Sequence, residues 1–223
     1  MISKDALQFI EELKKNNNRE WFLANKKRYE SYKKEYLGLI AEFLEAMKPK
    51  DPSLKMLEPK NCTFRINRDI RFSKDKSPYK THMGIWMNTN AAGVNAPGYY
   101  IQLEKGQSFL AAGFHTPEAG DLKKIRKEIA FFHDDLEAIV NEKDFKKTFG
   151  DIDRNDSLKT APKDFDKDHP AIGFLKLKSF TVTDKLTDDM VADKDFVKKT
   201  AEKLLAAKPF NVFLNRALTT EES

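Results

Sequence analysis

The spacing of the apolar residues changes twice along this 223-residue chain, and these changes constrain the fold more than any single motif does. From Leu7 to Met47 the apolar residues recur at helical intervals until Pro49 stops the pattern. Between residues 62 and 115 they alternate, as in strands with one buried face. From residue 117 the helical spacing returns. This order predicts an α+β fold, in which N-terminal, central and C-terminal helices pack on one face of an antiparallel β-meander.

The length and the 40% hydrophobic content predict a single domain over residues 1–223, because such a chain buries roughly 70% of its unfolded surface. Within it we expect a helical region over 1–48, the β-meander over 62–115, a helix over 117–141 and a mixed C-terminal region over 156–218. The first strand would span 62–72 with Cys62, Phe64, Ile66, Ile70 and Phe72 on its apolar face. The single cysteine is then a small core residue.

Polar residues at the expected helix ends support these boundaries. Ser3 is positioned to cap a first helix, and Asn18 a longer one that continues to Met47. Tyr29, Tyr32 and Tyr36 lie on one stripe of that helix, which is typical of a core face, although a stacking platform has the same spacing. Thr116 followed by Pro117 predicts the start of the central helix.

The charge of the chain is concentrated in one short segment. The net charge is +5, and residues 65–80 alone carry +4, so the rest of the chain is nearly neutral. The basic residues of this segment are Arg65, Arg68, Arg71, Lys74, Lys76 and Lys80, and its acidic residues are Asp69 and Asp75. A localised positive patch on a nearly neutral protein favours a pocket for an anion over a broad cationic surface.

We therefore interpret the segment as a binding site for a phosphorylated or carboxylated small molecule. The predicted ligand-binding residues are Arg65, Arg68, Arg71, Lys74, Lys76, Lys80 and His82. Arg68 and Arg71 would clamp the anion, while Lys74 and Lys80 would attract it. If the protein is an enzyme, the candidates for catalysis are His82, Asp69 and Tyr79, since a histidine carries protons near neutral pH.

Two alternatives remain open from the sequence. In a nucleic-acid-binding module the same basic segment would contact backbone phosphates, and Trp86 or Tyr100 would stack on a base. In a structural or interaction domain, pairs such as Arg71 with Asp69 would only neutralise each other and organise a loop.

Several common classes of site lack their motifs in this chain. The sequence contains no GxSxG, GxxxxGK[ST] or GxGxxG motif, and we name no cofactor. Its four histidines show neither HxH nor HExxH spacing, so we predict no metal site. No apolar run approaches the roughly 20 residues of a membrane helix, and the N-terminus is amphipathic where a signal peptide would be apolar. We expect a cytoplasmic protein with no membrane partner.

Three stretches of the chain resemble a known family. RDIRFSKDKSPYKTHMGI, GYYIQLE and AGFHTPE are similar to the bacterial and fungal domain of unknown function family 2461, whose activity is not established. The likeness extends from NNNREWF through APKDFDKDHP to LKLKSF, which implies one domain over most of the chain. The positions that match by this resemblance are Arg68, Asp69, Arg71, Phe72, Ser73, Lys74, Asp75, Lys76, Pro78, Tyr79, Lys80, His82, Pro162, His169, Pro170 and Lys178. This chain differs from the family pattern at Asp164 and at Ala112, where glycine is common.

Overall fold

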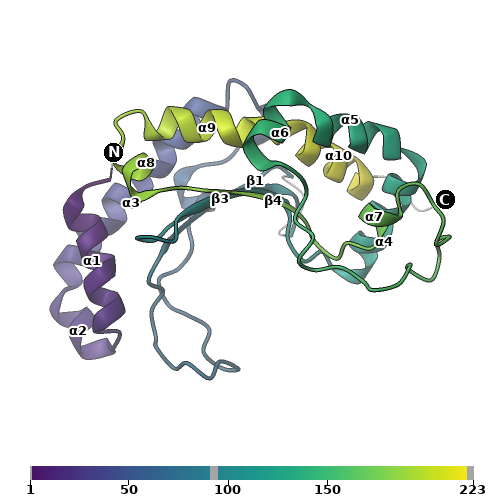
Figure 1. Cartoon of the computed structure of the whole chain (residues 1–223). Coiled ribbons are helices and arrows are strands. Elements are labelled where there is room, and N and C mark those ends of the chain that lie inside the picture. Colours follow the sequence, from purple (N-terminus) through teal and green to yellow (C-terminus); the bar gives the residue numbers. More distant parts are fainter. Residues whose placement is uncertain (1, 91–94, 220–223) are drawn as a thin grey trace. The chain divides into compact units, whose positions relative to one another are not determined.

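The protein combines helices with a four-stranded antiparallel sheet in the order β1-β2-β3-β4 (Figure 1). This architecture is seen in a computed structural model that describes residues 2–90 and 95–219. The strands are β1 Met83–Asn88, β2 Gly98–Leu103, β3 Phe109–Phe114 and β4 Phe180–Lys185. The predicted α+β class and the antiparallel meander are confirmed.

The helices precede, interrupt and follow the strands along the chain (Figure 1). Their bounds are α1 Lys4–Lys15, α2 Arg19–Ala24, α3 Lys26–Met47, α4 Ala119–Phe131, α5 His133–Asn141, α6 Lys143–Phe149, α7 Ile172–Leu175, α8 Asp188–Ala192, α9 Phe196–Ala206 and α10 Lys208–Thr219. Two short 3-10 helices, η1 Pro52–Leu54 and η2 Pro59–Cys62, lead toward β1. No helix in the described ranges has both the length and the apolar character needed to cross a membrane.

Alternation correctly identifies the inward-facing residues of the first two strands. Met83, Ile85 and Met87 are buried on β1. Tyr99, Ile101 and Leu103 of β2 are buried in the same alternating way. The turn after β2 contains Gly106 at φ +72, a conformation that glycine adopts without strain. An alternating apolar pattern is therefore enough to predict the buried residues of a strand when one face of that strand lies in the core.

The strand predicted over residues 62–72 is wrong. Cys62 ends η2 and is fully buried, as a core cysteine should be, but the residues that follow form a loop with only isolated bridges at Thr63 and Asn67. Phe64 is 44% exposed and Phe72 is 96% exposed, so they share no buried face. The backbone of 66–68 pairs instead with the returning stretch 78–80, because the Arg68 N–H donates to the Pro78 carbonyl and the Lys80 N–H to the Ile66 carbonyl.

Two predicted helices are interrupted and one helix start is displaced. The long N-terminal helix is divided at Asn25, although Asn18 caps α2 as predicted by accepting from the Trp21 N–H. The predicted helix over 117–141 is divided at Phe132. Thr116 does not cap α4, which begins after Glu118. The reason is that Thr116 has φ +51 and its N–H donates to the Ser179 hydroxyl.

The chain divides into two compact units. Unit 1 consists of Met1–Met87, Tyr100–Leu110 and Lys185–Ala201, and unit 2 of Asn88–Tyr99, Ala111–Asp184 and Glu202–Ser223. That residues 1–223 form a single domain stays a prediction.

Unit 1 is built around the N-terminal helices. Ser3 caps α1 as predicted, since its hydroxyl accepts from the Ala6 N–H, and α1 packs against α3. Phe9 and Phe43 are buried in this unit, and Phe43 meets Phe196 of α9 edge-on with ring centroids 5.7 Å apart. These contacts fix α3, which forms part of the candidate site.

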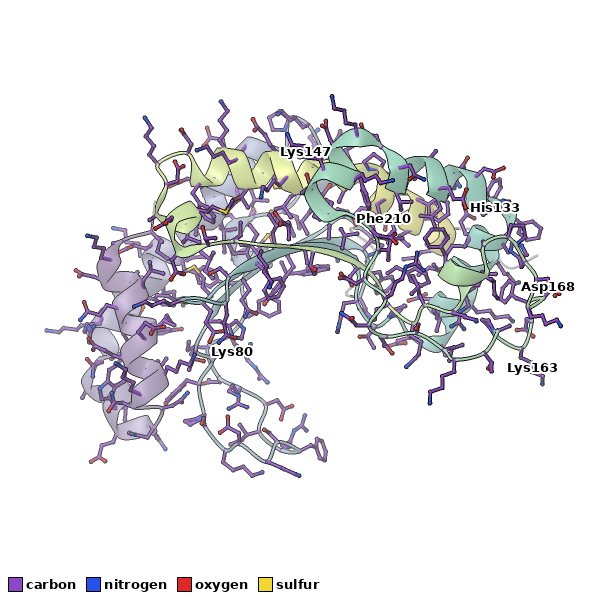
Figure 2. All side chains as sticks on the ribbon, in the orientation of Figure 1. Lys80, His133, Lys147, Lys163, Asp168 and Phe210 are labelled. Carbon is purple, nitrogen blue, oxygen red and sulfur yellow. The ribbon has the colours of Figure 1, made fainter. Side chains whose placement is uncertain are left out.

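Unit 2 contains a helical cluster in which α10 packs against α4 and α5. Phe210 of α10 lies in its core and meets Phe145 of α6 at 5.9 Å (Figure 2). In the same unit Gly113 of β3, at φ +109, lies so close to β4 that a Cβ there would be 2.1 Å from the Phe180 carbonyl oxygen. Only glycine fits this position.

Candidate functional site

The charged segment forms a long loop of unit 1, residues 63–82, which we call the basic loop (Figure 1). Its base is held by Asn17, which follows α1. The Tyr79 N–H donates to Asn17 Oδ1 at 3.0 Å, and Asn17 Nδ2 donates to the Tyr79 carbonyl at 2.9 Å. The buried Tyr79 ring stacks on Phe22 with centroids 4.1 Å apart. The sequence reasoning missed Asn17, because nothing in its local pattern links it to a residue 62 positions away.

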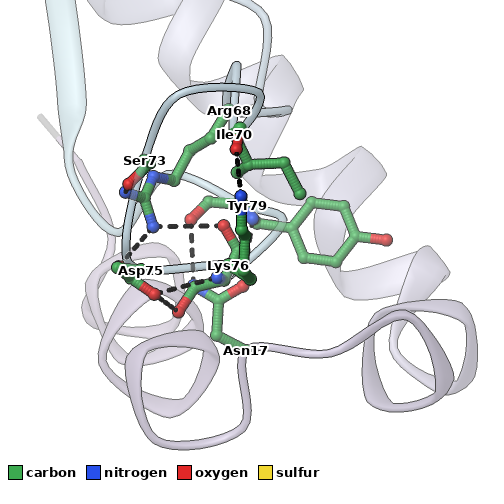
Figure 3. A network of polar contacts seen from close by, with 8 residues as sticks. Asn17, Arg68, Ile70, Ser73, Asp75, Lys76 and Tyr79 are labelled. Carbon is green, nitrogen blue, oxygen red and sulfur yellow. Dashed lines mark hydrogen bonds and ion pairs between the residues drawn. The ribbon is translucent and has the colours of Figure 1, made fainter.

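Arg68 organises the interior of the basic loop (Figure 3). Its guanidinium pairs with Asp75 at 2.5 Å and donates to the Ser77 carbonyl at 3.1 Å. Asp75 also accepts from the backbone N–H and the hydroxyl of Ser77. Hydrogen bonds from Ser77, and then from Arg68, lower the pKa of Asp75 to about 2. The Arg68 charge is therefore already balanced inside the loop.

Two further basic residues of the loop also have partners within it. Arg71 donates from Nε and Nη2 to both oxygens of Asp69, at 3.0 and 2.7 Å, and this pairing lowers the pKa of Asp69. Lys76 Nζ donates to the Ile70 carbonyl at 3.0 Å (Figure 3). The structure thus contains the Arg71–Asp69 pair that the structural alternative assumes.

A different set of cations gathers at a cavity of about 530 Å³ between α3 and the start of the basic loop, which we call the basic groove. Its lining residues are Tyr29, Tyr32, Lys33, Tyr36, Leu37, Lys60, Thr63, Phe64, Arg65, Ile66, Asn67, Lys80, His82 and Gly84. Four of these side chains are lysine or arginine, and none of the described residues in the lining is acidic. The groove is therefore electropositive.

Arg65 and Lys80 form the cationic pair of the basic groove. Lys80 lies at the base of the loop (Figure 2) and donates from Nζ to the Arg65 carbonyl at 2.9 Å. Burial lowers the pKa of Lys80, and the nearby Arg65 charge lowers it further. Among the described residues, neither the Arg65 guanidinium nor the Lys33 ammonium makes an ion pair or a hydrogen bond, although the Arg65 charge helps to lower the pKa of Asp69. An anion in the groove would relieve the repulsion between Arg65 and Lys80.

His82 lies where the basic groove meets a second cavity of about 570 Å³. This cavity is lined by Lys14, Asn17, Arg68, Asp69, Asp75, Ser77, Tyr79, Lys80, Thr81 and His82. Burial lowers the pKa of His82, an effect that Glu104 opposes and Lys80 reinforces. The imidazole is thus mainly neutral at pH 7, the state in which it can accept a proton. All three candidates for catalysis, His82, Asp69 and Tyr79, border this second cavity.

The polar side chains along β2 and just beyond it form a hydrogen-bonded ladder. The Tyr100 hydroxyl donates to Gln102 at 3.1 Å, and Gln102 donates to Glu104 at 3.2 Å. Lys14 of α1 pairs with Glu104 at 2.8 Å. Tyr100 is half-buried and packs against Phe64 and Phe109, so its ring is engaged within the protein.

The structure separates the seven predicted ligand-binding residues into two groups. Arg65, Lys80 and His82 line the basic groove, whereas Arg68, Arg71 and Lys76 brace the loop and Lys74 is exposed on it. The sequence reasoning missed Lys33 and Lys60 as groove residues. Lys33 could have been found, since it lies four residues after Tyr29 and thus shares a helix face with it; Lys60 carries no such signal.

The described residues contain no group of three or more histidine, cysteine, aspartate or glutamate side chains that could hold a metal ion. One family model, described as conserved hypothetical protein (DUF2461), matches residues 5–213. No curated protein and no solved structure matches the chain significantly.

Proposed function

The chain belongs to the DUF2461 family of conserved hypothetical proteins, and from this premise we propose that it binds a small molecule carrying a phosphate or carboxylate group in the basic groove. The observation that carries the proposal is the one-sided charge of the groove. Lys33, Lys60, Arg65 and Lys80 line it without an acidic residue among the described lining. Lys60 is paired with Glu58 at 2.7 Å, whereas Lys33 and Arg65 are unpaired among described residues.

In this proposal Arg65 and Lys80 hold the anion and Lys33 adds charge from α3. A guanidinium suits this role because its fork can donate two parallel hydrogen bonds to one oxyanion. Arg68, Arg71 and Lys76 act indirectly, since their contacts set the shape of the basic loop. His82 orients the ligand or accepts a proton from it, whereas Lys74 lies outside both cavities and does not contact the ligand.

The size and the lining of the groove support a small ligand. A cavity of about 530 Å³ falls within the roughly 300–1,000 Å³ that small-molecule sites occupy. Its walls combine aromatic and aliphatic side chains with a few convergent cations, which is the composition of such sites.

Thermal unfolding with and without inorganic phosphate, sugar phosphates and short carboxylates tests the proposal. A ligand at about 100 times its dissociation constant stabilises the folded protein by roughly 2.7 kcal/mol. For a chain of this size that raises the melting temperature by about 5–10 °C. We expect this shift in the wild type and not in Arg65→Ala. The matched control is Lys74→Ala, which also removes one cation from the basic loop but lies outside both cavities.

Two results would contradict the proposal. One is a wild-type midpoint that no small anion raises. The other is a Lys74→Ala variant that loses the shift as completely as Arg65→Ala does, because binding would then follow the total charge of the loop and not the groove.

A nucleic-acid-binding module remains a second candidate because of Phe72. Its side chain is 96% exposed and lies beside Arg71, whose guanidinium carbon is 5.8 Å from the ring centroid. An exposed aromatic among cations is the kind of platform on which bases stack. Binding of this kind weakens steeply with salt through counterion release and would be lost in Phe72→Ala, whereas the groove proposal expects Phe72→Ala to bind small anions normally.

A further inference from the structure

The basic groove has an aromatic wall as well as cations. Tyr29, Tyr32 and Tyr36 of α3 follow one another along it, with successive ring centroids 6.3 and 6.0 Å apart. Tyr32 and Tyr36 are buried and belong to the core. Tyr29 is only half-buried and lines the groove, while its ring also packs on Phe22 with centroids 4.9 Å apart. The core interpretation of the tyrosine stripe is therefore confirmed for Tyr32 and Tyr36.

Phe64 supplies a second aromatic surface in the groove. It is 44% exposed, although large apolar side chains normally avoid water when a core position is available. Its position is fixed, since its N–H donates to the Tyr36 hydroxyl at 3.4 Å and its ring meets Tyr100 edge-on at 6.2 Å. Lys80 Nζ lies 5.1 Å from the Phe64 centroid, so the groove cation and the aromatic surface are adjacent.

The floor of the groove is adapted to these rings. A Cβ on Gly84 would come within 3.0 Å of the Tyr100 hydroxyl and 3.2 Å of the Phe64 ring. Glycine at this position therefore leaves room for the Phe64 ring beside β1. The Gly84 carbonyl also accepts a hydrogen bond from the Tyr36 hydroxyl, which joins the floor to α3.

We infer that the ligand of the basic groove is a phosphate ester with a planar aromatic ring, a nucleotide or an aryl phosphate, whose ring packs on Phe64 and Tyr29 while Arg65 and Lys80 hold the phosphate. This inference rests on the proposed function. A partly exposed aromatic side chain next to a cation offers complementary contacts to such a ligand, because rings stack on rings and the oxyanion pairs with the cation. A sugar phosphate can pair with the cations but has no aromatic ring to stack on Phe64.

Isothermal titration at one fixed salt concentration distinguishes these ligands. The probes are AMP, phenyl phosphate, ribose 5-phosphate and inorganic phosphate. We expect AMP, phenyl phosphate or both to bind at least tenfold more tightly than ribose 5-phosphate. Tight binding of AMP alone points to a nucleotide, and tight binding of phenyl phosphate as well points to any aryl phosphate.

Phe64→Leu should abolish this preference for a ring while leaving the affinity for inorganic phosphate within threefold of wild type. Phe72→Leu is the matched control, because it removes an exposed phenylalanine from the same loop at a position outside the groove. It should keep the preference. Circular dichroism of both variants establishes that they are folded.

The outcomes separate the inference from the function on which it rests. If ribose 5-phosphate binds as tightly as AMP and phenyl phosphate, the inference is overturned and the anion site stands. If Phe64→Leu retains the full preference, the aromatic wall is not the determinant and the inference is again overturned. If none of the four probes binds, the inference is overturned, and the thermal-unfolding test with short carboxylates decides whether the anion site stands.

Discussion

Replacing Asn17 by alanine should detach the base of the basic loop. Asn17 makes two hydrogen bonds with the backbone of Tyr79, at 3.0 and 2.9 Å, and both are partly buried. Two such bonds contribute together about 2 kcal/mol to the free energy of unfolding. For a chain of this length the loss corresponds to a decrease of about 4–8 °C in the melting temperature.

Differential scanning calorimetry measures this loss, and amide hydrogen exchange locates it. In the wild type the Tyr79 N–H should be protected, because Asn17 Oδ1 accepts its hydrogen bond. In Asn17→Ala that amide should exchange much faster, while amides of buried β1 residues such as Ile85 keep their protection.

Asn16→Ala provides the control for this experiment. Its side chain makes one exposed hydrogen bond, from Nδ2 to the Glu12 carbonyl, so we expect a decrease of less than about 1 kcal/mol. A melting temperature of Asn17→Ala that equals the wild type, or a Tyr79 amide that exchanges equally fast in both proteins, would refute the idea that Asn17 anchors the loop.

Three other predictions follow from the geometry. Asp75 has a pKa of about 2 against an ordinary 3.8, so its contribution to stability is present above pH 4 and is lost as the pH falls toward 2. The melting temperature of Asp75→Asn should therefore depend less on pH in this window than that of the wild type. Equal pH dependence of the two melting temperatures would count against the Arg68–Asp75–Ser77 network. Gly113→Ala should lower the free energy of unfolding by more than about 3 kcal/mol, because its Cβ would collide with the Phe180 carbonyl. Gly150→Ala, which has open space at φ +76, should lower it by only about 1 kcal/mol. Similar losses for the two variants in urea unfolding would contradict this. Burial and the nearby Arg65 charge lower the pKa of Lys80 below its ordinary 10.5, so the phosphate affinity of the wild type should fall relative to that of Lys80→Arg as the pH rises toward that value; a ratio of the two affinities that does not change with pH would contradict this.

The sequence predicts strands well where one face of the strand is in the core. Met83, Ile85 and Met87 alternate because the sheet buries every second residue, and the same holds for β2. Residues 62–72 alternate just as clearly but form no strand. Their apolar side chains lie in three different environments, since Cys62 is in the core, Phe64 borders the groove and Phe72 faces water. Alternation alone cannot distinguish these cases.

For the candidate site, the sequence predicts a segment and roles within it. Of the predicted ligand-binding residues, Arg65, Lys80 and His82 line the basic groove. The expected clamp of Arg68 and Arg71 requires their charges to be available, yet Asp75 and Asp69 already balance them. Which arginine pairs with which aspartate depends on the path of the loop. That path is fixed by Asn17, a residue distant in sequence.

A crystal structure of the protein with phenyl phosphate bound tests the central claim most directly. The account predicts the phosphate group within hydrogen-bonding distance of the Arg65 guanidinium and Lys80 Nζ, with the phenyl ring against Phe64. A phosphate bound instead at Arg71 or Lys74 of the loop, with the basic groove empty under saturating ligand, would contradict it.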